Sequence, residues 1–108
     1  MTGYVFVESR STADSPDVAA TLDLVDGLGR AGHEVTLYLV QNAVLLAGAT
    51  SPAGAALARG QHVRVWADDW SLDARGLPTS WLALGVRVAT MAELVRLLAQ
   101  PGVVPVWH

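Results

Sequence analysis

Short apolar runs rich in β-branched and aromatic residues alternate with polar or helix-forming stretches along this chain of 108 residues. Runs of this kind are typical of strands that are covered on both faces. They lie at 4–8, 34–40, 62–67, 86–89 and 103–107. The repeated order of strand and helix with short connections predicts an α/β fold. We expect a three-layer sandwich with a mainly parallel five-stranded sheet and helices on both faces.

The stretches between these runs carry signals that mark helix ends. Ser15 and Pro16 predict the N-cap and first residue of a helix that Gly32 ends. Thr90 with Glu93 three residues later predicts a capping box at the start of another helix. The further expected segments are a helix over 91–99, short helices over 42–47 and 55–59, a loop over 48–54 and a polar turn or helical segment over 68–75.

Length and composition limit the organisation and the partners of the chain. A chain of 108 residues has room for one core, so we expect a single domain over 1–108. Hydrophobic residues make up 52% and charged residues 16%, which is less charge than a small monomer normally carries on its surface. The excess of apolar residues favours a homo-oligomer.

Several classes of function are disfavoured by the same composition. The longest apolar stretch, 35–46, is interrupted by polar residues, and the N-terminus lacks a signal-peptide pattern, so a soluble cytoplasmic protein is expected. All seven basic residues are arginine and the net charge is −3, which argues against nucleic acid as a partner. The chain contains no cysteine, which excludes disulfides and catalysis by a thiolate of its own.

Polar side chains follow the predicted strands at the points where they end. In parallel sheets, ligands bind beyond the carboxyl ends of the strands, where the connecting loops converge. We therefore expect a pocket at this edge. Its candidate residues are Ser9, Arg10, Gln41, Asn42, Asp68, Asp69, Trp70 and Arg75.

The arrangement of the whole chain resembles the DsrE/DsrF-like family of small α/β proteins. The resemblance rests on the segment Val-Thr-Leu-Tyr-Leu-Val-Gln-Asn-Ala-Val-Leu-Leu-Ala at 35–47, on Arg-Gly-Leu at 75–77 and on Leu-Gly-Val-Arg-Val at 84–88. It implies a dimer, trimer or hexamer. In several members, including the TusD-like ones, a cysteine after the third strand relays sulfur as a persulfide.

The resemblance places Asp68 where that cysteine would stand. A carboxylate can neither accept sulfane sulfur stably nor pass it on, so this chain is not expected to be a persulfide sulfurtransferase by itself. Members without the cysteine act as companions in sulfur-relay assemblies. The resemblance therefore implies a structural or regulatory partner that associates with another DsrE-family protein or with a sulfurtransferase.

The candidate residues also admit simpler interpretations. Asp68 and Asp69 could form a carboxylate pair for a ligand, but a helix N-cap at either residue is favoured. Arg75 could hold an anion or form a surface ion pair with Asp69 or Asp73. The loop 9–11 after the first strand could grip an oxyanion or simply be solvated.

The aromatic and histidine residues are weaker candidates. Trp66 is expected in the core, whereas Trp70 and Trp81 could line a pocket wall or a subunit contact. The three histidines, at 33, 62 and 108, lack metal-binding spacing, so we predict neither a metal site nor a cofactor. Two functions stay open: an oligomeric, non-catalytic partner protein, and a small-molecule binder or enzyme that uses Asp68, Asp69 and Arg75.

Overall fold

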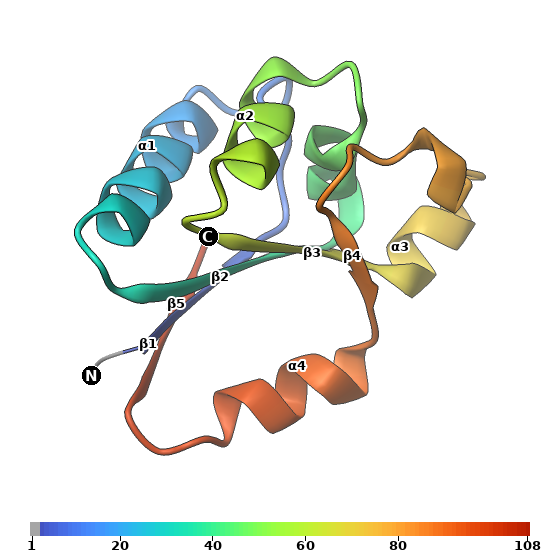
Figure 1. The fold of residues 1–108 in the computed structure, drawn as a ribbon. Helices are drawn as coiled ribbons and strands as arrows, with labels where there is room; N and C mark the ends of the chain where they lie inside the picture. Colours follow the sequence, from blue (N-terminus) through green and yellow to red (C-terminus); the bar gives the residue numbers. More distant parts are fainter. Residues whose placement is uncertain (1–2) are drawn as a thin grey trace.

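The computed structural model describes residues 3–108 and contains one sheet of five parallel strands. Across the sheet the order is β4-β3-β2-β1-β5, so the first strand of the chain lies inside the sheet and the last one forms an edge (Figure 1). The strands are β1 (Gly3–Glu8), β2 (Glu34–Leu39), β3 (Arg64–Asp68), β4 (Arg87–Ala89) and β5 (Val103–Trp107). The predicted parallel α/β sheet is confirmed.

Helices cover both faces of this sheet, as predicted. Figure 1 shows α1 and α2 on one face, α4 on the other face, and α3 beyond the end of β3. The helical segments are α1 (Asp17–Arg30), the 3₁₀ segment η1 (Gln41–Ala47), α2 (Pro52–Gly60), α3 (Asp69–Ala74), the 3₁₀ turn η2 (Thr79–Trp81) and α4 (Met91–Leu98). Within residues 3–108, no helix has both the length and the apolar character needed to cross a bilayer.

Two hydrophobic clusters, one on each side of the sheet, hold the layers together. Successive residues of a strand point to opposite faces, so β1 contributes to both clusters. Phe6 belongs to the cluster under α1, η1 and α2, whereas Val5 and Val7 belong to the cluster that also contains Leu94 and Leu97 of α4. The side of the sheet that carries α4, which we call the α4 face, is therefore packed mainly by one helix.

Two helix starts differ from the sequence prediction. Helix α1 has Pro16 rather than Ser15 at the N-cap position, although the Ser15 hydroxyl still accepts a hydrogen bond from the Asp17 backbone N–H at 3.2 Å. Helix α2 begins at Pro52, inside the stretch expected to be a loop. Proline is well suited to a first helical position because it has no N–H to leave unpaired.

Candidate functional site

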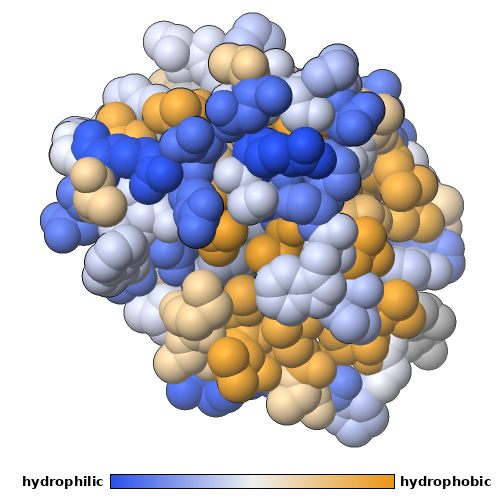
Figure 2. Space-filling model, turned by 180° about the vertical axis from the view of Figure 1, so that it is seen from behind, coloured by the Kyte–Doolittle hydropathy of each residue, from blue (hydrophilic) through white to orange (hydrophobic). Residues whose placement is uncertain are grey.

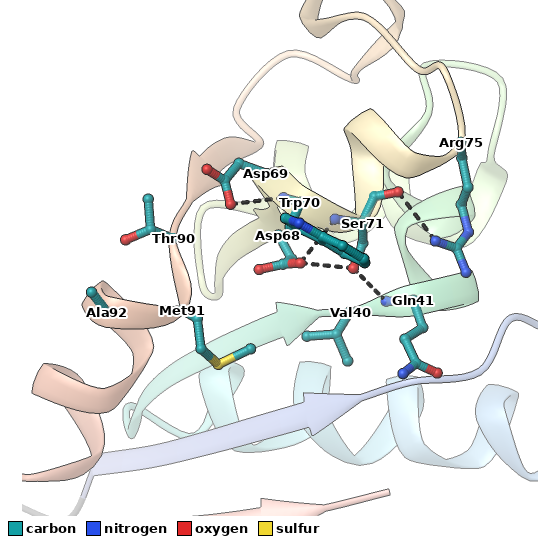
Figure 3. A pocket seen from close by; sticks show the side chains of 10 residues that line it. All are labelled: Val40, Gln41, Asp68, Asp69, Trp70, Ser71, Arg75, Thr90, Met91 and Ala92. Carbon is teal, nitrogen blue, oxygen red and sulfur yellow. Dashed lines mark hydrogen bonds between the residues drawn. The ribbon is translucent and has the colours of Figure 1, made fainter.

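A cavity of about 650 Å³ opens at the edge of the sheet where β2 and β3 end (Figure 3). Its walls come from the residues after β2, from α3 and from the first residues of α4. A volume of this order accommodates a small organic ligand. The lining residues are Val40, Gln41, Asp68, Asp69, Trp70, Ser71, Arg75, Thr90, Met91 and Ala92.

Asp68 lies at the inner wall of this cavity and is almost completely buried, at 4% exposure. One carboxylate oxygen accepts a hydrogen bond from the Tyr38 hydroxyl at 2.6 Å. The other accepts from the backbone N–H of Ser71 at 2.9 Å and from its hydroxyl at 2.7 Å. Asp68 is thus the N-cap of α3, which confirms the cap interpretation for this residue.

The pKa of Tyr38 is shifted by its buried position beside Asp68. Burial raises the pKa of the Tyr38 hydroxyl, and the hydrogen bond to Asp68 and the negative charges of nearby carboxylates raise it further. The phenol therefore keeps its proton and donates a hydrogen bond to the Asp68 carboxylate. This pair ties the C-terminal end of β2 to the end of β3 beneath the cavity.

Asp69 and Trp70 project from the first turn of α3 and are exposed. The Asp69 carboxylate accepts a hydrogen bond from the Trp70 backbone N–H at 2.7 Å, so the two neighbouring carboxylates have different partners. Trp70 is 77% exposed, which is unusual for so large an apolar ring. It lines the cavity, whereas Trp81 packs against the hydrophobic cluster under α1, η1 and α2 and does not line the cavity.

Arg75 follows α3 and forms neither of the surface ion pairs considered from the sequence. Its guanidinium donates to the Asn42 side-chain oxygen at 2.9 and 3.2 Å and to the Ser71 carbonyl at 3.1 Å. The ion-pair interpretation was wrong because the chain after β2 brings an amide oxygen closer than either aspartate. Figure 3 shows Asp69 and Arg75 extending from opposite ends of α3.

Ser9, Arg10 and Asn42 do not line this cavity. The backbone N–H groups of Ser9 and Arg10 donate to the carboxylate of Glu8 at 2.9 and 3.1 Å. That carboxylate is fully buried and lies 2.6 Å from Nδ1 of His108, so the donors expected to grip an oxyanion already have an internal anion. Asn42 reaches the site only through its bond to Arg75.

Some residues of the site were missed at the level of sequence. Val40, Met91 and Ala92 contribute apolar wall. Outside the cavity, Glu8 is a buried acid that the sequence shows only as the last residue of an apolar run. Met91 was detectable, because it directly follows the predicted N-cap Thr90 at the end of a strand. Trp66 lies in the core as predicted. Within residues 3–108, no cluster of three histidine or acidic side chains has the arrangement of a metal site.

The fold and this edge define a small α/β protein with a parallel sheet and a mixed polar and apolar cavity at the strand ends. Two solved structures share the fold. The YchN protein from E. coli superposes with a TM-score of 0.80 at 23% identity, over 97% of this chain and 99% of its own. MTH1491 from Methanobacterium thermoautotrophicum, a protein of unknown function, gives 0.76 at 20% identity over the full length of both chains.

Comparison of the sequence with known families and proteins assigns no family and no function to the chain. No protein-family model matches the chain, and no curated protein matches it. Identities of 23% and 20% establish the common fold and nothing about the ligand or the reaction.

Proposed function

We propose that this chain is a non-catalytic, self-associating cytoplasmic protein of the DsrE-like kind, which acts as a structural or regulatory partner of a sulfur carrier. The observation that carries the proposal is Asp68. It stands where the resemblance places a sulfur-carrying cysteine, and both of its oxygens are engaged by Tyr38 and Ser71. A residue held in this way stabilises the strand end and offers no nucleophile for sulfur.

Exposed apolar side chains on the α4 face support self-association. Figure 2 shows apolar residues gathered in the lower part of the view from behind, where α4 lies. Met91 and Val95 of α4 and Trp107 of β5 are each more than half exposed. Trp107 pairs with Val7 across the β1–β5 ladder, and Val7 belongs to the hydrophobic cluster of this face. Aromatic and methionine side chains of this kind are enriched in interfaces between subunits.

Sedimentation of the purified chain tests the self-association. The proposal requires a dimer, trimer or hexamer, and a monomer at high protein concentration would refute this part. The sulfur-related part is tested separately, by mixing the chain with a purified cysteine-bearing DsrE-family protein from the same genome. Co-migration of the two proteins supports partnership, whereas self-association without co-migration refutes the sulfur-related role alone.

A second candidate function, small-molecule binding, is favoured by the cavity itself. Arg75 supplies a positive group at one end of α3, the exposed Asp69 carboxylate lies at the other end, and Val40, Trp70 and Met91 supply apolar wall. This combination suits a small organic acid with an apolar body. Phenylacetate and benzoate are suitable probes in a titration followed by NMR. Arg75→Gln should weaken binding of either acid, whereas equal binding by the variant would remove Arg75 from the site.

A further inference from the structure

Three arginines from three different elements line a separate hollow on the α4 face, beside the edge strand β4. They are Arg64 of β3, Arg87 of β4 and Arg96 of α4. The hollow measures about 310 Å³ and is also lined by Trp66 and Glu93. None of these residues lines the cavity at the strand ends.

Strand register explains how the arginines meet. Arg87 is the partner of Trp66 in the parallel pairing of β3 with β4. Arg64 precedes Trp66 by two residues, so its side chain leaves the same face of the sheet. On α4, Glu93 and Arg96 lie one helical turn apart and project toward the same side. The pairing of β3 with β4 and the packing of α4 against the sheet bring these separate elements together.

Arg87 is held in a fixed position within the hollow. Its guanidinium carbon lies 4.7 Å from the centre of the Trp66 ring, which is itself buried. The Glu93 carboxylate forms an ion pair with the same guanidinium. Glu93 is in turn fixed by the capping box with Thr90. Stacking and pairing together orient the planar group before any ligand arrives.

Positive charge in the hollow exceeds negative charge. Arg64 and Arg96 are exposed and form no ion pair or side-chain hydrogen bond with any residue in the range 3–108. Three guanidinium charges against the single carboxylate of Glu93 leave +2 on these four groups, while the whole chain carries −3. Glu34 borders a neighbouring hollow together with Arg64 but does not pair with it.

We propose that this hollow is a binding site for a phosphate-type oxyanion that carries two or more negative charges. Guanidinium groups bind such anions through paired N–H donors, and Arg87 already presents its group in a fixed orientation. Arg64 and Arg96 supply the remaining charge from the two sides. A singly charged carboxylate would leave part of the positive charge uncompensated, so the site distinguishes the two classes. The proposal is independent of the function suggested for the strand-end cavity. The hollow lies at the β4 edge of the α4 face, whereas Trp107 of the proposed subunit contact lies on β5 at the opposite edge.

Titration at constant ionic strength tests this site. We expect saturable binding of inorganic pyrophosphate and phosphate, and much weaker binding of acetate. Calorimetry and the NMR signal of the Trp66 indole N–H measure the binding. Arg64→Gln and Arg96→Gln should each weaken pyrophosphate binding about tenfold or more, the usual effect of losing a charge-assisted hydrogen bond. Phenyl phosphate distinguishes a phosphate ester from a free inorganic anion as the ligand. Tighter binding of phenyl phosphate than of phosphate indicates an ester, and equal binding indicates a free inorganic anion.

A matched control excludes a general effect of net charge. Arg59→Gln removes the same charge from an exposed position of α2 that does not line the hollow. Circular dichroism of all three variants checks that the fold is retained. The proposal is overturned if neither phosphate nor pyrophosphate binds saturably, if acetate binds as well as pyrophosphate, or if Arg59→Gln weakens binding as much as Arg64→Gln.

Discussion

Asp68 illustrates how a buried carboxylate at the end of a strand can anchor the residues around it. Replacing Asp68 by Ala leaves the Tyr38 hydroxyl and the Ser71 N–H without their buried acceptor. Loss of a cap and of charged hydrogen bonds should lower the free energy of unfolding by roughly 2–4 kcal/mol. Urea unfolding measures this change, and Asp69→Ala, at the exposed neighbouring position, should change stability by less than about 0.5 kcal/mol. Equal effects of the two variants would contradict the anchoring role of Asp68.

Tyr38 makes the stability of the protein sensitive to alkaline pH. Burial and Asp68 raise the pKa of the Tyr38 hydroxyl in the folded state. In the unfolded chain this hydroxyl has its ordinary pKa of about 10, so it loses its proton at a lower pH there than in the folded protein. The unfolded state then binds fewer protons, so this contribution to stability is complete below about pH 10 and is lost as the pH rises further. Unfolding measured from pH 8 to 11 should therefore show a steeper loss for the wild type than for Tyr38→Phe. Parallel curves would show that Tyr38 does not titrate differently in the two states.

At the scale of elements, the start of α2 depends on close contact with η1. A methyl group on Gly54 would overlap the Leu46 carbonyl oxygen, whereas one on Gly27 of α1 would meet nothing within 4 Å. Gly54→Ala should therefore destabilise the fold by roughly 1–3 kcal/mol through overpacking. Gly27→Ala should stabilise it by about 0.5–1 kcal/mol through higher helix propensity. Thermal unfolding of both variants checks that their changes in stability have opposite signs. A stabilising effect of Gly54→Ala would disprove the close contact between α2 and η1.

The elements themselves were largely predictable because their signals are local. The apolar runs gave the strands, and Thr90 with Glu93 marked the start of α4 from neighbouring residues alone. Pairs that join distant segments were not predictable. Tyr38 meets Asp68 across 30 residues and Glu8 meets His108 across 100, because the register of β2 with β3 and of β1 with β5 sets these distances. The arginine hollow depends on strand register in the same way.

For the whole molecule, the two sides of the sheet are covered unequally, and this difference bears on where a second subunit would bind. Helices α1 and α2 with η1 cover one side, whereas α4 is the main cover of the other and leaves apolar groups exposed there. Leu24 of α1 shows that an exposed apolar residue also occurs on the well-covered side. The two sides can therefore be compared through one similarly exposed apolar residue on each.

Val95 of α4 and Leu24 of α1 form a matched pair for that comparison, since they are 58% and 53% exposed. Val95→Glu places a charge within the proposed contact, where it would lose its water on association, and should shift the protein to a monomer. Leu24→Glu adds the same charge on the opposite side and should leave the oligomer intact. Sedimentation velocity of the wild type and both variants distinguishes the cases. Dissociation by Leu24→Glu with Val95→Glu unchanged would move the contact to the α1 side of the sheet and refute the assignment of the α4 face.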